Sequence, residues 1–319
     1  MSEPIVLLTN PIHPDGEKIL SPHAQLLIAP DAKPETLRSL ASDVQGIIVR
    51  AKLPDDIVEH APKLKGMVRH GVGLDFIPVK AATAKGIAVA NLPGSNTTAV
   101  AEYCMSAMSQ LRRPLYRMDA LLRREGWGPA RAVAEQLTEL GGSRLGILGV
   151  GTIGGRVAEI AYEGFGMKVM GTSRRKGSLP PFVQEVSLEE LFENSDAIVV
   201  SCALTDETRG IVDASLIARM PRHSILINVS RGAVIDTAAI VEALNSNKIA
   251  GAALDVFDVQ PLPADSGLFG CPNLLLTPHA AAITASSSRA MSVGAAEEMV
   301  RILRGERPLN LVNPDSMAK

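Results

Sequence analysis

The sequence predicts an α/β fold with two doubly wound parallel sheets, and three observations lead to this prediction. Short runs rich in Val, Ile and Leu alternate with longer amphipathic segments, which is typical of parallel strands covered by helices on both faces. These runs form two series, separated by one long helical segment. The chain has 319 residues, which is enough for two domains.

The first series of apolar runs predicts the sheet of an N-terminal domain. Helical segments are expected between its later strands, at 33–43 and 54–64, because apolar and polar positions there have helical spacing. The predicted strands lie at 5–9, 25–29, 46–49, 66–70 and 87–91.

A long, mostly apolar segment from Asn96 to Arg113 predicts the helix that crosses to the second domain. Pro114 ends or kinks this helix, since proline lacks the amide donor that a helix interior needs. The second series of predicted strands follows, at 145–150, 167–173, 196–202, 224–230, 249–256 and 273–279.

The chain is expected to return to its first domain after residue 279, through another long helix and a short terminal strand. The first domain is therefore predicted to comprise 1–98 and 287–319, and the second to comprise 99–286.

Composition and charge exclude several classes of protein. The formal net charge is −2, so no basic field favours nucleic acid. The three cysteines lie far apart, which predicts neither a disulfide framework nor a metal site. No apolar run reaches the roughly 18 residues of a membrane span, and the first residues do not resemble a signal peptide. A cytoplasmic protein is expected.

A glycine pattern follows the first strand of the second series. Gly149, Gly151 and Gly154 form GxGxxG, with Thr152 and Ile153 between them, directly before a segment of helical periodicity. In this context the glycines allow a tight turn, a close approach to a pyrophosphate and close packing of helix on strand. These five residues are predicted to bind a dinucleotide.

The end of the next strand favours NADP over NAD. An acidic residue usually stands there and binds the adenosine ribose, but this chain has Ser173, Arg174 and Arg175. A hydroxyl and two guanidinium groups suit a 2′-phosphate, which an aspartate would repel. NAD remains possible, because these residues could also form a solvated basic turn.

Five ordered motifs resemble the D-isomer-specific 2-hydroxy-acid dehydrogenases, which include phosphoglycerate dehydrogenase, glyoxylate/hydroxypyruvate reductase and formate dehydrogenase. The resemblance implies two Rossmann-like domains, of which the first is flavodoxin-like, with the active-site cleft between them. It also implies a homodimer built mainly through the cofactor domain. The motifs are "RHGVGLDFIPV", "NTTAVAEY", "LINVSRGAVIDTAAIVEAL", "GAALDVFDVQPLP" and "NLLLTPHAA".

The resemblance also assigns roles to residues of the motifs. Arg231 matches the family's substrate arginine, and His279 matches its acid/base. The backbone amides of the segment from Gly71 through Val72 to Gly73 match a cradle for the substrate carboxylate. Asp255 matches a residue that meets the nicotinamide carboxamide, and Val229 is assigned to the cofactor site.

One position departs from the family pattern. The catalytic glutamate that precedes a proline is replaced here by Gln260, so the charge beside the acid/base is in question. Asp258, two residues earlier, is a possible substitute. Formate dehydrogenases also carry glutamine at this position, and their reaction needs no proton transfer to the substrate.

The predicted function is the NADP-preferring reduction of a small 2-oxo acid, such as glyoxylate or hydroxypyruvate. Arg50 and His70 are candidates for binding a second anionic group of the substrate, or else are charged strand ends in solvent. Two alternatives remain open. One is a formate-like oxidation without an acid, and the other is a dinucleotide-sensing protein that binds partners and is not an enzyme.

Overall fold

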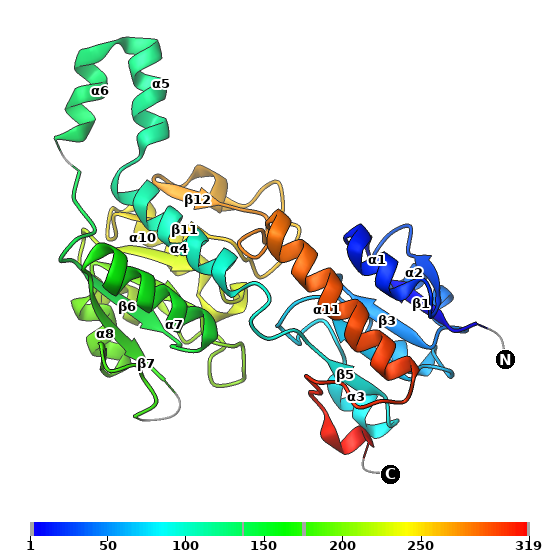
Figure 1. Cartoon of the computed structure of the whole chain (residues 1–319). Helices are drawn as coiled ribbons and strands as arrows, with labels where there is room; N and C mark the ends of the chain where they lie inside the picture. The colour runs from blue at the N-terminus through cyan, green and yellow to red at the C-terminus, as the bar shows by residue number, and fades with distance from the viewer. Residues whose placement is uncertain (1–2, 136, 174–176, 318–319) are drawn as a thin grey trace. The chain divides into compact units, whose positions relative to one another are not determined.

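The computed structural model describes residues 3–135, 137–173 and 177–317, and the chain divides into two compact units (Figure 1). Unit 1 comprises Met1–Asn96 and Ile283–Lys319, and unit 2 comprises Thr97–Ala282. The chain thus passes between the units two residues before the first predicted crossing and four residues before the second. The first crossing coincides with the start of the helix at Thr97, and the second precedes the last long helix.

Unit 1 is built on a wholly parallel sheet with the strand order β2-β1-β3-β4-β5. Leu7 and Ile47 pack with α2 and α3, whereas Val6 and Ile48 pack with α1 and α11. This alternation follows from the two-residue period of a strand and explains why the strands are apolar throughout. The elements are β1 Ile5–Leu8, α1 Pro14–Leu20, β2 Gln25–Ile28, α2 Pro34–Leu40, β3 Gly46–Val49, β4 Gly66–Arg69, α3 Val79–Ala84, β5 Ala88–Ala90 and α11 Ala285–Leu303.

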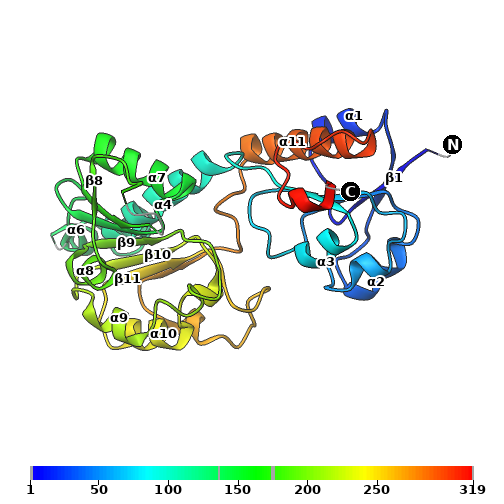
Figure 2. The ribbon, with the colours of Figure 1, turned by 90° about the horizontal axis from the view of Figure 1, so that it is seen from below.

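Unit 2 has a seven-stranded parallel sheet with the order β12-β11-β10-β9-β6-β7-β8. Its two faces are covered by α4 and α7 and by α8 to α10, as Figure 2 shows for α7 and α10. The strands are β6 Arg144–Leu148, β7 Lys168–Thr172, β8 Val183–Glu185, β9 Ala197–Val200, β10 Ile225–Asn228, β11 Gly251–Leu254 and β12 Leu274–Leu276. The helices are α4 Thr97–Arg112, α7 Thr152–Glu159, α8 Leu188–Asn194, α9 Ala214–Arg219 and α10 Thr237–Asn245.

The strand order of unit 2 reverses between β6 and β9. From β6 the chain proceeds outward to β7 and β8, and it then returns to place β9, β10, β11 and β12 on the other side. Ligands of open α/β sheets bind outside the carboxyl ends of the strands at such a reversal. The loop that follows β6 contains the glycine pattern, so the fold places this pattern where a ligand is expected.

Two sequence predictions differ from the observed elements, and one observed strand was not predicted. The helix expected at 54–64 is only a 3₁₀ turn, Ile57–Glu59, because the prolines at positions 54 and 62 bracket it and restrict the preceding residues. The expected terminal strand is a single antiparallel bridge between Ala90 and Leu311, followed by a 3₁₀ turn, Pro314–Met317. The short edge strand β8 was not predicted.

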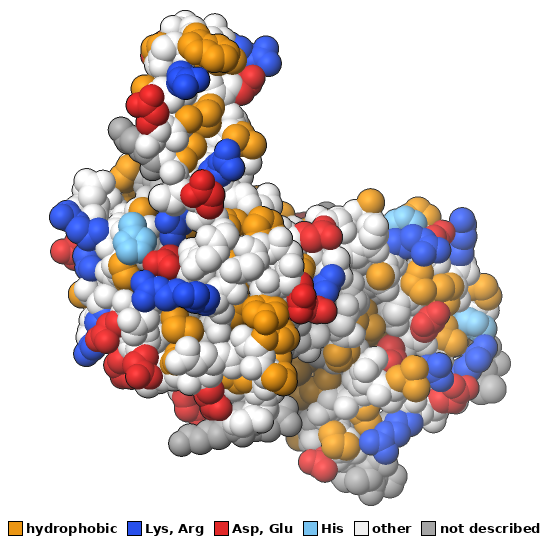
Figure 3. All heavy atoms as spheres, turned by 60° about the vertical axis from the view of Figure 1, so that its left-hand side comes forward, with side chains coloured by type: hydrophobic (Ala, Val, Ile, Leu, Met, Phe, Trp, Pro, Cys, Tyr) orange, Lys and Arg blue, Asp and Glu red, His pale blue; other side chains and the backbone are white. Residues whose placement is uncertain are grey.

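A helical hairpin of unit 2 was also not predicted. Pro114 ends α4 as expected, but two further helices follow, α5 Leu115–Glu125 and α6 Trp127–Ala134. None of the residues of α5 is buried. The hairpin projects from the body of unit 2, and hydrophobic side chains lie on its surface (Figures 1 and 3). Its large exposed apolar residues are Leu115, Tyr116, Leu122 and Trp127.

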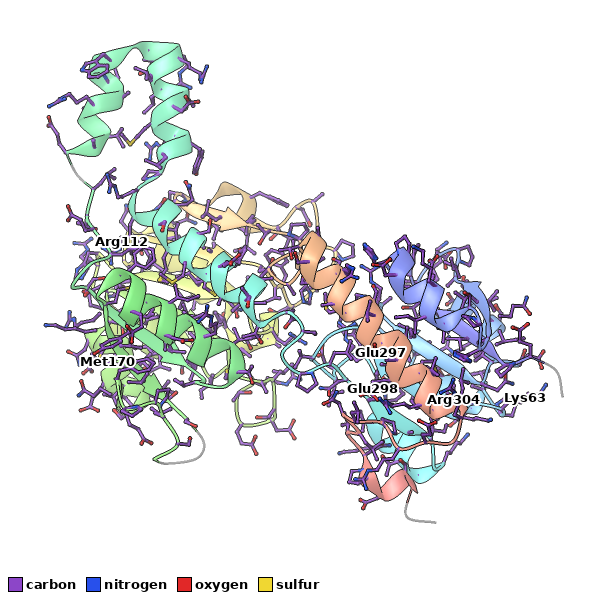
Figure 4. The ribbon with its side chains drawn as sticks, viewed as in Figure 1. Lys63, Arg112, Met170, Glu297, Glu298 and Arg304 are labelled. Carbon is purple, nitrogen blue, oxygen red and sulfur yellow. The ribbon has the colours of Figure 1, made fainter. Side chains whose placement is uncertain are left out.

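The C-terminal segment is fastened to unit 1 by a buried carboxylate. Glu298 lies on α11 (Figure 4) and is only 3% exposed. It accepts hydrogen bonds from the amides of Leu309 and Asn310 at 2.9 and 3.1 Å. Further along, the side chain of Asn313 accepts a hydrogen bond from the amide of Val89 at 2.8 Å. Helix α11 and the residues after it therefore complete the domain that begins with β1.

Candidate active site

The three glycines of the loop after β6 meet different local requirements. Gly149 has a φ of +96°, and a Cβ there would lie 2.5 Å from the Cα of Cys202. A Cβ on Gly154 would lie 2.4 Å from the carbonyl oxygen of Gly149. A Cβ on Gly151 would meet no atom within 4 Å. Packing therefore requires the first and third glycines, whereas the second leaves its backbone open to a ligand.

The amino end of α7 provides the charge that a pyrophosphate needs. Its N-cap is Gly151, and no side chain caps the first amides of the helix. Uncapped amides at a helix N-terminus attract an anion. The side chain of Ile153 packs against the core, and Thr152 is exposed. The loop and helix thus fit the pyrophosphate of a dinucleotide.

Ser173 lies beside this loop. It follows β7 directly, and the last residue of that strand, Thr172, pairs with Leu148 at the end of β6. The hydroxyl of Ser173 lies 3.1 Å from that of Ser178. The predicted cofactor residues Arg174 and Arg175 lie outside the described residues. Val229, after β10, donates its amide to the carbonyl of Val200 at 3.1 Å.

The segment from Gly71 to Gly73 presents backbone amides. Its carbonyl oxygens are held, because Asn91 Nδ2 donates to Val72 at 2.8 Å and Arg69 Nε donates to Gly73 at 3.1 Å. Within the described parts of the chain, no residue accepts a hydrogen bond from the amide of Val72 or Gly73. Successive unshared amides form a concavity that suits a carboxylate.

Arg50 and His70 follow the adjacent strands β3 and β4. The Arg50 guanidinium donates to the carbonyl of Pro11, and burial lowers its pKa. His70 is 6% exposed, and its Nε2 lies 2.9 Å from the hydroxyl of Ser292 on α11. Burial and the nearby charge of Arg50 lower the pKa of His70 to about 4. A neutral imidazole offers no charge to a second anionic group, so Arg50 is the better candidate of the two.

Arg231 stands in a turn that is organised by a residue we did not predict. Asn228, the last residue of β10, is 1% exposed. Its Oδ1 accepts a hydrogen bond from the amide of Ser230, and its Nδ2 donates to the carbonyl of Arg231, both at 3.0 Å. An Asn that bonds the backbone two residues on is typical of a turn, and this signal could have been read from the sequence.

Gly232 joins this turn to the segment that precedes Gln260. A Cβ on Gly232 would lie 2.0 Å from the carbonyl carbon of Phe257 and 2.2 Å from the nitrogen of Asp258. Backbone cannot yield to such a contact, so only glycine fits. The glycine after Arg231 thus packs the arginine turn against the segment that leads to the partner of His279.

His279 is held by Asp255 through the backbone. The amide of His279 donates to the carbonyls of Asp255 and Thr277 at 2.8 and 2.9 Å, and its φ is +54°. The buried carboxylate of Asp255 accepts hydrogen bonds from the amides of Ala280 and Ala281 at 2.7 and 3.0 Å. Asp255, predicted to meet the nicotinamide carboxamide, therefore also fixes the turn that contains His279.

Gln260 contacts the ring of His279. Gln260 Oε1 lies 3.0 Å from Nδ1, and Gln260 Nε2 donates to the carbonyl of Phe257 at 3.3 Å. Because Oε1 only accepts, Nδ1 is the protonated nitrogen of the neutral ring, and Nε2 exchanges protons. Asp258 instead accepts a hydrogen bond from Thr237 at 3.0 Å. Gln260, and not Asp258, therefore contacts Nδ1 of His279, which corrects the expectation that Asp258 substitutes for the glutamate.

The described ranges contain neither a cluster of metal-binding side chains nor a helix that could cross a membrane. No group of three or more His, Cys, Asp or Glu residues among them could hold a metal ion. In these same ranges, none of the helices has the length and hydropathy that crossing a membrane requires.

Comparisons with known proteins define the class. The family described as "D-isomer specific 2-hydroxyacid dehydrogenase, NAD binding domain" matches residues 105–281. The glyoxylate reductase of Aeropyrum pernix is 36% identical over 98% of this chain and 97% of its own length. The hydroxypyruvate reductase of Thermotoga maritima is 34% identical over 93% of this chain and 98% of its own length.

A solved structure extends the similarity to the whole fold. The NADPH-dependent glyoxylate/hydroxypyruvate reductase of Sinorhizobium meliloti, in complex with NADP and malonate, has a TM-score of 0.87 at 29% identity, and the alignment covers 99% of this chain and 98% of that one. The chain belongs to the D-isomer-specific 2-hydroxyacid dehydrogenases. It is an oxidoreductase with two Rossmann-like units that uses a nicotinamide cofactor.

Proposed function

We propose that this protein reduces a small 2-oxo acid, glyoxylate or hydroxypyruvate, with NADP as its preferred cofactor. The observation that most supports this proposal is the contact between His279 Nδ1 and Gln260, because it makes Nε2 the ring nitrogen that exchanges protons. The similar enzymes of Aeropyrum pernix and Thermotoga maritima, a glyoxylate reductase and a hydroxypyruvate reductase, agree with the substrate class.

The substrate carboxylate is bound by backbone and by arginine. The amides of Val72 and Gly73 donate hydrogen bonds to it, and the bonds from Asn91 and Arg69 to the carbonyls of this segment keep its backbone in place. Arg231 binds carboxylate and carbonyl oxygens together, because its planar guanidinium donates two parallel hydrogen bonds. The same hydrogen bonds polarise the carbonyl and stabilise the negative charge that develops on its oxygen.

His279 supplies the proton. In reduction the protonated ring donates from Nε2 to the alkoxide oxygen, and in oxidation the neutral ring removes the proton from the hydroxyl. Gln260 keeps the ring oriented through both states, because Oε1 accepts from Nδ1 in each of them. A neutral amide adds no charge to stabilise the imidazolium.

Each group of candidate cofactor residues is assigned to the part of the cofactor that its chemistry suits. The loop at Gly149, Gly151 and Gly154 and the first amides of α7 would hold the pyrophosphate. Ser173, Arg174 and Arg175 would bind the adenosine ribose and its 2′-phosphate. When bound, the nicotinamide group supplies or accepts the hydride.

Steady-state turnover of several 2-oxo acids with NADPH and with NADH tests this proposal. We expect glyoxylate and hydroxypyruvate to be reduced, with the higher kcat/KM for NADPH. Binding of NADPH without turnover of any 2-oxo acid would contradict the substrate class. Equal kcat/KM values for the two cofactors would contradict the preference alone.

Formate oxidation is a second candidate because of Gln260. A glutamine beside His279 suits a reaction that transfers hydride without a proton. Incubation with formate and either oxidised cofactor distinguishes formate oxidation from 2-oxo-acid reduction. NADH or NADPH should appear only if the protein oxidises formate.

We also propose that the protein is a homodimer in which the α5–α6 hairpin contacts the second copy. The support is the exposure of Leu115, Tyr116 and Trp127, which are 58%, 59% and 71% exposed on a projecting hairpin of unit 2. Exposed apolar surface of this kind marks protein contacts. The mass in solution, measured by light scattering, tests it. The cytoplasmic location expected from the sequence stays a prediction.

A further inference from the structure

Tyr103 connects α4 to the turn that contains His279. The phenol oxygen lies 2.7 Å from the hydroxyl of Thr277, two residues before His279. The ring of Tyr103 packs against the core between α4 and the sheet. Nothing in the proposed reaction requires a phenol at this place, so the contact needs an explanation of its own.

The direction of the hydrogen bonds can be derived. The hydroxyl of Thr277 lies 2.6 Å from Asp255 Oδ1, which also accepts from the amide of Ala280 at 2.7 Å. An ionised carboxylate only accepts hydrogen bonds, so Thr277 donates its single proton to Asp255. Tyr103 must then donate to Thr277. Burial, opposed only in part by the hydrogen bond to Thr277, raises the pKa of Tyr103 to about 12, so the phenol keeps its proton.

The side-chain hydrogen bonds run from Tyr103 through Thr277 to Asp255 and end at the amides of Ala280 and Ala281, which directly follow His279. The backbone carbonyls of Thr277 and Asp255 accept from the amide of His279, whose φ of +54° is uncommon for a residue with a side chain. Such a conformation persists only where the surrounding contacts determine it. Fixing the Thr277 hydroxyl fixes Asp255 and the turn together, and α4 is the rigid element to which they are attached.

We propose that Tyr103 is a positioning residue for the acid/base, which acts on His279 through Thr277 and Asp255. This inference rests on the proposed reductase function. Tyr103→Phe removes one hydroxyl and keeps the ring. We expect kcat for 2-oxo-acid reduction to fall about threefold to tenfold, which corresponds to one neutral hydrogen bond. KM for the 2-oxo acid and Kd for NADPH should be unchanged.

The matched control is Tyr162→Phe, since Tyr162 is 44% exposed and stacks on Phe182 away from this turn. It should leave kcat unchanged. A fall in Tm with an unchanged kcat in Tyr103→Phe would show a merely structural role and would overturn the proposal. If the wild type reduces 2-oxo acids and both tyrosine variants match it, only the inference about Tyr103 fails.

A double-mutant cycle tests the route through Thr277. Thr277→Val removes the link between Tyr103 and Asp255, so Tyr103→Phe should cause no further loss of kcat in that background. The same fold-loss in both backgrounds would overturn the proposal.

A second readout needs no turnover. The chain has six histidines, so their ring signals can be followed by NMR of histidine-labelled protein with NADPH bound. The signal of His279, assigned with His279→Gln, should shift in Tyr103→Phe and stay in place in Tyr162→Phe. An unshifted signal in Tyr103→Phe contradicts the inference, even if no 2-oxo acid is a substrate.

Discussion

Gln260 accepts a hydrogen bond from Nδ1 of His279 at 3.0 Å, at the position where the family resemblance implies a glutamate. The amide is fixed in this orientation because its nitrogen donates to the carbonyl of Phe257. Orientation of the ring and stabilisation of its charge are therefore separate properties at this site. Gln260 provides the first, and as a neutral amide it adds no charge of its own to the second.

Gln260→Glu should move the basic limb of the pH profile of kcat/KM for reduction to higher pH. A carboxylate beside the imidazolium stabilises the protonated form, which reduction requires, by roughly 1–3 pH units. The limb should move upward because protonated His279 then survives to higher pH. Asp258→Asn is the control, since Asp258 bonds Thr237 and should not affect the limb. A limb that stays in place would show that His279 is not the proton donor.

Arg231→Gln should lower kcat/KM for 2-oxo-acid reduction by at least about 100-fold. Two hydrogen bonds to a charged group are lost, each of about 1.5–3 kcal/mol. The affinity for NADPH, measured by fluorescence titration, should stay near that of the wild type. If Arg231→Gln loses both turnover and affinity for NADPH, the arginine is needed for the fold of the turn that Asn228 organises.

Arg174→Asp should shift preference from NADPH towards NADH. The expected cost for NADPH is about 1.5–3 kcal/mol, or roughly tenfold to hundredfold in KM, because a phosphate loses its charged partner. Lys176→Asp makes a similar change in charge two residues further on and serves as the control. An unchanged ratio of the two KM values would argue against a contact between Arg174 and the 2′-phosphate.

Gly232→Ala should reduce both stability and kcat. The added Cβ would lie 2.0 Å from the backbone of Phe257, so either the arginine turn or the segment before Gln260 must move. Such overpacking typically costs about 1–3 kcal/mol. Gly270→Ala is the control, because a Cβ there meets nothing within 4 Å. Thermal unfolding and kcat are measured together, and a variant with full activity would show that the contact does not position the site.

Asp196 should contribute to the acid stability of unit 2. Burial opposes its ionisation, but hydrogen bonds from Arg144 and His223 outweigh burial and lower its pKa to about 2. This contribution is present above the ordinary pKa of 3.8 and is lost as pH falls towards 2. Relative to the wild type, Asp196→Asn should have a lower Tm at pH 6, and the difference should shrink on acidification. A constant difference would contradict this account.

The apolar strands and the glycine loop were predictable, because burial on both faces and close backbone packing act through residues that are near in sequence. The helix at 54–64 failed because two prolines outweighed its periodicity. The α5–α6 hairpin has few buried residues, so hydrophobic pattern gave no sign of it.

Long-range contacts explain what was missed in the site. Nothing in the sequence shows that Tyr103 lies beside Thr277, or that the backbone at Phe257 abuts Gly232. Likewise, His70 follows a strand end, which suggests exposure, yet Ser292 on α11 lies against its ring.

Because unit 2 is one uninterrupted segment inserted into unit 1, the order of synthesis differs from the order of completion. Unit 2 is fully synthesised before α11 leaves the ribosome, whereas unit 1, although begun before unit 2, lacks one covering helix of its sheet until α11 is made. Domains generally fold as whole units. The cofactor-binding unit can thus reach its native state on the nascent chain, whereas unit 1 must wait for α11.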